Sequence, residues 1–320
     1  MMSRLAVLLL LLVSCFAQAA APSVLQRPVS LDTGQGVLHG SLLLPRSQVP
    51  PPVVLIIAGS GPTDRDGNNP EVGRIDILKR LALQLAAQGI ASVRYDKRGV
   101  AASLAATPDE RNLSVERYVA DAVAWSHKIK ADPRFGPLVL LGHSEGALIA
   151  SLAAEPAGAD AVIALAGSGR PVDQVLREQL AGRLPSDQLK RAEAALDRLK
   201  AGHPVIPAPG VLKDILRPSV QPYLISLFRQ DPAAAFGNLT VPALIIQGRN
   251  DIQVSPADAE ALQAAKPDAQ LALIDGMNHM LRISPAQRGQ QRNAYTNPEL
   301  PLASELGERI VAFVRQLTPG

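Results

Sequence analysis

The stretch from residue 138 to residue 150 constrains the fold of this chain more than any other. It begins with the apolar run LVLL, passes through GHSEG at residues 142–146 and continues as an alanine- and leucine-rich segment. The central five residues fit G-x-S-x-G, in which a serine occupies a sharp turn between a strand and a helix. The two glycines let strand and helix approach each other closely. We therefore expect Ser144 to project from the end of a buried strand; the alternative is a serine that only caps the helix.

Strand-like and helix-like segments alternate along most of the chain. The apolar runs typical of buried parallel strands are residues 53–58, 91–95, 138–141, 161–166, 243–247 and 271–274. Residues 29–32 and 37–44 are predicted to form two antiparallel strands around an intervening turn. The predicted fold class is α/β, with a mostly parallel sheet and helices on both of its faces.

A segment of about 70 residues interrupts this alternation. Residues 168–238 contain three helix-like stretches with charged faces, at 172–182, 186–201 and 220–229, and no strand-like run. The segment is too small for an independent catalytic domain. We therefore assign residues 20–167 and 239–320 to an α/β core and residues 168–238 to a helical cap insertion.

The N-terminal residues indicate an export signal. A short cationic start precedes apolar residues 5–13, which are too few to span a bilayer, and an A-x-A cleavage pattern follows at residues 17–19. We predict a signal peptide over residues 1–19 and a periplasmic or secreted protein. Residues 12–15 also match a lipoprotein box, which would leave Cys15 as a lipid-anchored N-terminus. Cys15 is the only cysteine, so cleavage after Ala19 removes every candidate for a disulfide or thiolate site.

Composition and motif content narrow the function classes. The net charge is +3, no run of Lys and Arg occurs, and aromatic residues make up 3% of the chain, which disfavours nucleic-acid binding. The sequence contains neither H-E-x-x-H nor G-x-x-x-x-G-K. We predict no metal, no cofactor and no nucleic-acid partner.

Two downstream residues have the type and position to activate Ser144. A serine hydroxyl needs a base, and the base needs an acid that orients it. Asp251 and His279 each follow an apolar run through a few polar residues, as Ser144 does. Because the carboxyl ends of parallel strands share one edge of the sheet, we expect the three side chains to meet there. Asp275 is the alternative acid.

An oxyanion hole is predicted from backbone N–H groups. The glycine-rich loop at residues 59–61 follows an apolar run, and Glu145 begins the helix after Ser144. We expect the N–H groups of Ser60 and Glu145 to bind a developing oxyanion, with Gly61 as the alternative to Ser60. In the alternative interpretation, these glycines have only a structural role and form a tight turn.

The loops beside this site carry several charges. We predict that Arg98 pairs with Asp66 or Glu145 and so joins two loops; plain solvated charge is the alternative.

Five short motifs carry a resemblance to a known family. They are GSGPTDRDGN at 59–68, YDKRG at 95–99, GHSEG at 142–146, GRND at 248–251 and GMNH at 276–279. With them the chain resembles the α/β-hydrolase superfamily, specifically bacterial esterases of the serine-aminopeptidase-like (hydrolase-4) branch. The resemblance implies a serine hydrolase that cleaves carboxylic esters without a cofactor, beneath a helical cap, with a small-molecule acyl ester as its substrate and partner. Ala58 replaces the histidine that commonly precedes the oxyanion-loop glycine, so a side-chain anchor for that loop is lost.

Two other functions fit the same residues. A peptidase or amidase could use the same three side chains, and an aminopeptidase would also need an acidic anchor for the substrate amine. A non-catalytic periplasmic binding protein on a hydrolase scaffold is the alternative from a different class, and the intact Ser, Asp and His set argues against it.

Overall fold

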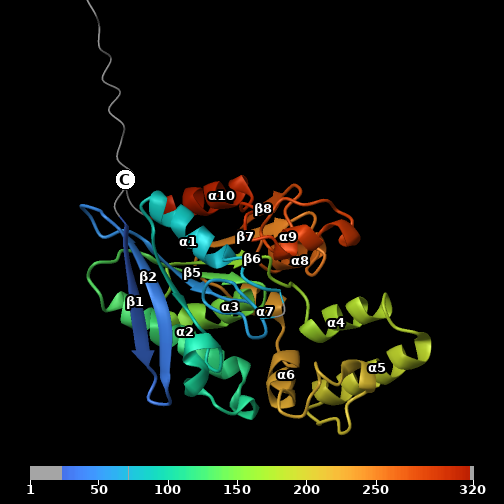
Figure 1. The fold of residues 1–320 in the computed structure, drawn as a ribbon. Helices are drawn as coiled ribbons and strands as arrows, with labels where there is room; N and C mark the ends of the chain where they lie inside the picture. The colour runs from blue at the N-terminus through green and yellow to red at the C-terminus, as the bar shows by residue number, and fades with distance from the viewer. Residues whose placement is uncertain (1–23, 71, 318–320) are drawn as a thin grey trace, which may run out of the picture.

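The computed structural model describes residues 24–70 and 72–317. The predicted signal peptide and Cys15 lie outside these residues. A single sheet runs through the molecule (Figure 1). Its strands are β1 (Val24–Asp32), β2 (Val37–Pro45), β3 (Val53–Ile57), β4 (Ala91–Tyr95), β5 (Leu138–His143), β6 (Ala161–Leu165), β7 (Ala243–Gly248) and β8 (Gln270–Ile274).

The strand order is β1-β2-β4-β3-β5-β6-β7-β8. From β4 to β8 every neighbouring pair is parallel, whereas β2 is antiparallel to both β1 and β4. The predicted hairpin of β1 and β2 and the mostly parallel sheet are both confirmed. The carboxyl ends of β3 to β8 therefore lie along one edge of the sheet, which we call the catalytic edge.

Helices cover both faces of this sheet. The α-helices are α1 (Ile77–Ala87), α2 (Val115–Lys130), α3 (Glu145–Ala157), α4 (Val172–Ala181), α5 (Ser186–Lys200), α6 (Gln221–Phe228), α7 (Pro232–Gly237), α8 (Pro256–Ala265), α9 (Arg292–Thr296) and α10 (Ser304–Arg315). Short 3-10 helices are η1 (Ala101–Ala106), η2 (Glu110–Asn112), η3 (Gly210–Leu212) and η4 (Arg288–Gln290). Helices α1 and α10 share a core with one face, and α2, α3 and α8 share a core with the other.

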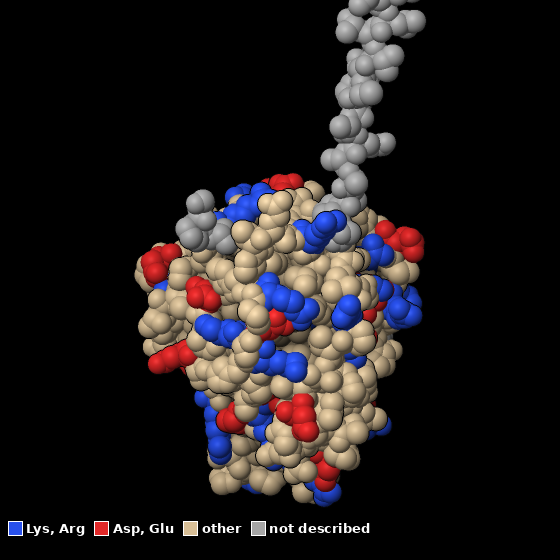
Figure 2. All heavy atoms as spheres, turned by 90° about the vertical axis from the view of Figure 1, so that its left-hand side faces the viewer, with Lys and Arg blue, Asp and Glu red and all other residues tan. Residues whose placement is uncertain are grey.

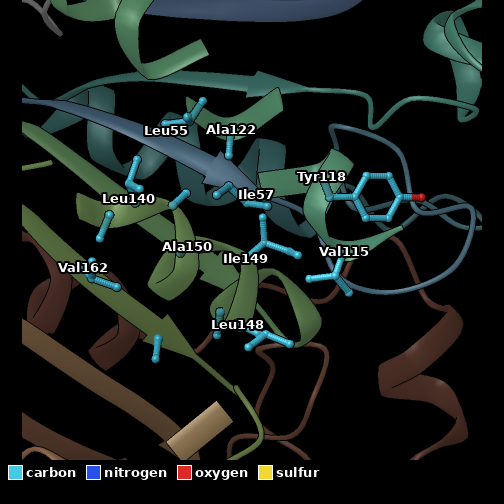
Figure 3. Close-up of a cluster of buried hydrophobic side chains, with 14 of the residues drawn as sticks. Leu55, Ile57, Val115, Tyr118, Ala122, Leu140, Leu148, Ile149, Ala150 and Val162 are labelled. Carbon is cyan, nitrogen blue, oxygen red and sulfur yellow. The ribbon is translucent and has the colours of Figure 1, made fainter. Parts of the chain in front are cut away.

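The two cores explain why the central strands are continuous apolar runs. Successive side chains of a strand point to opposite faces. Leu55 and Ile57 of β3 therefore pack with α2 and α3, where Figure 3 shows Leu55 near Ala122 and Ile57 near Ile149. Val54 and Ile56 pack with α1 and α10 on the opposite face. A strand covered on both sides has no solvent-facing positions, so polar alternation is lost.

Residues 168–238 form a helical insertion after β6. Figure 1 shows α4, α5 and α6 as a lobe beside the sheet. The insertion is fixed to the body: the Ser226 hydroxyl accepts a hydrogen bond of 3.0 Å from the Val115 amide, and Arg217 Nε lies 2.7 Å from Glu110 Oε1. The buried leucines of α5 and α6 belong to the same core as α2 and α3.

The prediction of a charged face on the third insertion helix is wrong. Six of the eight residues of α6 are buried, including Gln221 and Tyr223. The helix lies between α2 and α5, so both sides of it are covered. Gln221 is accommodated because its amide donates to the carbonyl groups of Val205 and Leu216 at 2.9 and 2.7 Å.

Figure 2 shows the face that carries β1 and β2, where basic and acidic side chains are intermingled. Such a mixture does not form the single-sign field that concentrates a charged polymer. Among the described helices, none is both long enough and apolar enough to cross a bilayer.

Candidate active site

Ser144 occupies a strained turn between β5 and α3. Its backbone has φ 56° and ψ −122°, a conformation that residues other than glycine rarely adopt. The turn is compatible only with small neighbours. A Cβ added to Gly142 would lie 1.9 Å from the Gly146 carbonyl oxygen, and one added to Gly146 would lie 2.3 Å from the Ile57 carbonyl oxygen. The sharp strand–turn–helix predicted from residues 142–146 is therefore present, with steric grounds for both glycines.

His279 connects Ser144 to Asp251. Its Nε2 lies 3.1 Å from Ser144 Oγ, and its Nδ1 lies 2.7 Å from Asp251 Oδ2. Asp251 follows β7 and His279 follows β8, so the three residues come from the carboxyl ends of three strands. Asp251 and His279 are 8% and 3% exposed. The structure thus brings the three predicted side chains into one hydrogen-bonded series at the catalytic edge.

Asp251 is held as an ionised carboxylate. Its Oδ1 accepts hydrogen bonds from the amides of Gln253 and Val254 at 2.8 and 3.0 Å, and its Oδ2 accepts one from Gln247 Nε2 at 3.1 Å. Burial acts to raise the pKa of Asp251, but His279 and the backbone amides of Gln253 and Val254 outweigh it, so the pKa falls below its usual value. The hydrogen bond from Gln247 to Asp251 was not predicted, because a glutamine at the end of an apolar strand belongs to no recognisable motif.

The alternative acid Asp275 does not reach the site. Its side chain is 90% exposed, and it pairs with Arg249 at 2.7 Å. The side chain of His143, the residue before Ser144, packs against the ring of His279, and its Nε2 lies 3.0 Å from the His279 carbonyl oxygen.

The glycine-rich loop after β3 lies against the nucleophile. A Cβ on Gly59 would lie 3.1 Å from Ser144 Cβ. The loop is held at two successive carbonyl groups: Lys97 Nζ donates to that of Gly59, and Thr63 Oγ1 donates to that of Ser60 at 2.8 Å. Lys97 therefore anchors this loop in a protein whose residue 58 is alanine.

The second expected oxyanion donor is the amide of Glu145. As the first residue of α3, Glu145 has an N–H that no carbonyl group of its own helix can accept, and the helix dipole adds positive potential there. The Glu145 carboxylate acts on buried neighbours. Its charge opposes the lowering of the Lys97 pKa by burial and adds to the raising of the Tyr223 pKa by burial.

The predicted pairing of Arg98 with Asp66 or Glu145 is wrong. Arg98 pairs with Asp121 of α2, with Nε 2.7 Å from Oδ2, and both side chains are buried. Asp66 instead accepts hydrogen bonds from Arg94, with Nη2 2.9 Å from Oδ1. The sequence places Asp121 in the middle of a helix, where nothing marks it as facing the loop after β4.

The loops at 59–69 and 96–103 are nevertheless joined, through Asp96. This buried carboxylate accepts from Arg65 Nε at 3.1 Å and from Arg65 Nη2 at 2.6 Å, and it also accepts from the amide of Ala102 at 3.0 Å. A bidentate guanidinium–carboxylate pair fixes orientation as well as distance. The loop that carries Ser60 is therefore fixed on both flanks.

Two cavities adjoin Ser144 and Ser60. One, of about 190 Å³, is lined by Glu145, Leu148 and residues of α4 that include Val172, Val175 and Leu176. The other, of about 300 Å³, is lined by His279, Met280 and polar residues of the glycine-rich loop. A larger hollow of about 580 Å³ lies around Val24, Pro45 and Pro51, at the opposite end of the sheet, and contains none of the site residues.

A mostly parallel sheet that presents a serine, a histidine and a carboxylate at its carboxyl edge has the architecture of an α/β hydrolase. The chain belongs to the alpha/beta hydrolase family, whose model matches residues 54–288. The matched range begins in β3 and extends past His279, so it includes all three side chains of the hydrogen-bonded series.

Individual relatives agree with this assignment. Esterase EstD of Thermotoga maritima is 29% identical over 261 residues, a match that covers 76% of this chain and 58% of that protein. The chain therefore spans less than two thirds of the length of this relative. Among solved structures, Est1E of Butyrivibrio proteoclasticus with bound ferulic acid has a TM-score of 0.57 at 16% identity, covering 90% of this chain and 96% of its own. Proline iminopeptidase of Mycobacterium smegmatis has a TM-score of 0.58 at 15% identity, with coverages of 91% and 98%.

Proposed function

We propose that the protein is a serine carboxylesterase that forms an acyl-enzyme on Ser144. The observation that carries this proposal is the series from Ser144 Oγ through His279 to Asp251, with separations of 3.1 and 2.7 Å. These distances are within the range in which a base can accept a hydroxyl proton while an acid orients the base. The esterase named among the relatives supports the same class of substrate.

The proposed reaction has two halves. His279 accepts the proton of Ser144 as its oxygen attacks the ester carbonyl, and Asp251 stabilises the resulting imidazolium. The N–H groups of Ser60 and Glu145 bind the tetrahedral oxyanion, with Gly61 as the alternative donor on the loop side. His279 then donates its proton to the departing alcohol. A water molecule activated by His279 hydrolyses the acyl-enzyme by the same route.

The two cavities suit the two parts of an ester. The leaving alcohol must lie near His279, which lines the cavity of about 300 Å³. The acyl group then occupies the cavity of about 190 Å³ beneath α4, whose walls include Val172, Val175 and Leu176. A volume of about 190 Å³ corresponds to about six water molecules at about 30 Å³ each. This space therefore suits a short acyl chain. Residues 168–238 would thus act as a cap that sets chain-length preference.

An aminopeptidase is the competing activity, and one residue bears on it. Among the described residues that line the two cavities, Glu145 is the sole acid. Its charge acts to raise the pKa of the buried Lys97, so this acid has a cationic neighbour before any substrate binds. We therefore favour an ester over a substrate with a free amine. Aminoacyl anilides and short p-nitrophenyl esters, compared on one enzyme preparation, distinguish the two.

The decisive experiment replaces the nucleophile. Ser144→Ala should lose p-nitrophenyl ester hydrolysis and labelling by a fluorophosphonate. Ser151→Ala is the matched control, because this buried serine of α3 only donates to the Ala147 carbonyl group at 2.8 Å. Turnover by purified Ser144→Ala at the level of the control would refute the proposal.

We also propose that the protein is exported. The support is the signal-like pattern of residues 1–19. Cell fractionation followed by N-terminal analysis of the mature chain tests this. A start at Ala20 fits a processed periplasmic or secreted enzyme, a lipid-modified start at Cys15 fits an anchored one, and an intact Met1 in the cytoplasm contradicts export.

A further inference from the structure

Lys97 is a buried charge that the proposed mechanism leaves unused. It directly follows the strand β4 and Asp96, and it is 2% exposed. Burying an ammonium group is unfavourable unless polar partners compensate it. Its partners are the Gly59 carbonyl oxygen, the ring of Tyr118 at 5.4 Å from Nζ, and the charge of Glu145.

The hydrogen bond to Gly59 also determines the direction of the Ser60 N–H, one of the two proposed oxyanion donors. The C=O of Gly59 and the N–H of Ser60 belong to one planar peptide unit. In a trans peptide these two groups point in opposite directions, and the only cis bond in the described chain is Ile206-Pro207. Holding the Gly59 oxygen against Lys97 therefore aims the Ser60 N–H away from Lys97. Ser60 and Ser144 together line both cavities of the site.

The second donor lies beside the same peptide unit. The other N–H of the proposed oxyanion hole belongs to Glu145, the first residue of α3, which directly follows Ser144. A Cβ on Gly59 would lie 3.1 Å from Ser144 Cβ, so the peptide that Lys97 holds lies against the start of α3.

We propose that Lys97 is a positioning residue that sets the geometry of the oxyanion hole by fixing the Gly59–Ser60 peptide against the start of α3. The inference rests on the proposed function, because it concerns an oxyanion that only acyl transfer produces. Replacing the ammonium with an apolar group frees the Gly59 carbonyl, and the Ser60 peptide can then rotate. The transition state loses a donor while the cavities that bind the substrate keep their walls.

The test compares two buried lysines. Lys97→Met is set against Lys266→Met, since Lys266 is also buried and also donates to a backbone carbonyl, that of Leu239 at 3.0 Å, but lies outside the site. Loss of one oxyanion donor lowers kcat by about 10²–10³-fold. We expect a loss of that order in Lys97→Met with KM changed by less than about threefold, and kcat close to the wild-type value in Lys266→Met.

A transition-state analogue gives the second readout. A trifluoromethyl ketone forms a tetrahedral adduct with the serine, so its affinity should fall in Lys97→Met in parallel with kcat. Lys97→Leu, which also lacks a donor, is used if Lys97→Met does not fold. The inference is overturned if a folded Lys97 variant keeps wild-type kcat and inhibitor affinity, or if Lys266→Met loses as much activity. Activity in Ser144→Ala would instead refute the proposed function itself.

Discussion

The imidazole of His143 lies beside that of His279, with ring centroids 5.0 Å apart and an angle of 43° between the planes. His143 Nε2 is 3.0 Å from the His279 carbonyl oxygen, which requires a proton on that nitrogen. Burial, followed by the charge of His279, lowers the pKa of His143 to about 3. The residue before the nucleophile is thus a neutral histidine that holds the backbone of the proposed base.

This histidine should make stability depend on pH. In the unfolded chain His143 binds a proton below about pH 6.5, whereas the folded protein excludes that proton until about pH 3. The free energy of unfolding should therefore fall as the pH drops from 6.5 towards 3, by up to about 1.4 kcal/mol per pH unit from this group. His143→Gln, which can keep a donor to the carbonyl, should lack this part of the slope in denaturant titrations from pH 7 to 4. The exposed His203→Gln is the control, and equal slopes in His143→Gln and wild type would contradict the prediction.

Replacing the carboxylate of Asp251 should affect the chemical step. In Asp251→Asn the neutral amide cannot stabilise the imidazolium form of His279, so we expect kcat to fall by about 10³–10⁴-fold with little change in KM. Asp275→Asn alters an exposed carboxylate that pairs with Arg249 and should leave kcat within about twofold. Steady-state kinetics on a p-nitrophenyl ester measure both. Similar losses in the two variants would mean that Asp251 is not the orienting acid.

Adding one methyl group to the oxyanion loop should reduce turnover. The new Cβ of Gly59→Ala would lie 3.1 Å from Ser144 Cβ and 3.3 Å from the His143 carbonyl oxygen, so the loop must shift by a few tenths of an ångström. We expect kcat to fall by about tenfold or more, because a misplaced donor stabilises the oxyanion less. Gly182→Ala is the control, since its Cβ meets no atom within 4 Å. A wild-type kcat in Gly59→Ala would show that the loop adapts freely.

The Arg98–Asp121 pair should matter for stability. Burial raises the pKa of Asp121, and Arg98 only partly offsets this effect. In Arg98→Met the carboxylate is left buried without its partner, and we expect a loss of about 3–5 kcal/mol in the free energy of unfolding. Arg191→Ala removes an exposed pair with Asp187 and should change it by less than about 0.5 kcal/mol. Denaturant unfolding distinguishes the two, and equal small losses would argue against a structural role for Arg98.

The cavity beneath α4 should determine which acyl chain lengths the enzyme hydrolyses. Leu176→Phe adds bulk to a lining residue. Hydrolysis of hexanoate and longer esters should therefore fall by about tenfold or more relative to acetate, as expected when several methylene groups no longer fit. Leu180 lies one turn further along the same helix and does not line the cavity, so Leu180→Phe should keep the wild-type profile. A chain-length profile unchanged in Leu176→Phe would place the acyl group elsewhere.

The sequence predicts those features of the fold and site that depend on local residue patterns. The apolar runs located the central strands, and the positions of Ser144, Asp251 and His279 after such runs placed them on one edge. Local patterns do not predict side-chain pairings between segments that are distant in the sequence. Nothing local indicates that Arg98 faces Asp121 of α2, or that Lys97 reaches the carbonyl group of Gly59. These contacts depend on how loops and helices pack, which is fixed only in three dimensions.

The ends of the described chain have a practical consequence. Val24 pairs with Pro45 at the end of the sheet opposite the catalytic edge. Arg315, near the close of α10, donates to Gln88 at 3.1 Å, just before β4 begins at that same end. Coupling the enzyme to a resin or electrode through either of these two ends would therefore orient Ser144 toward the bulk solution, so an immobilised preparation should keep its substrate access.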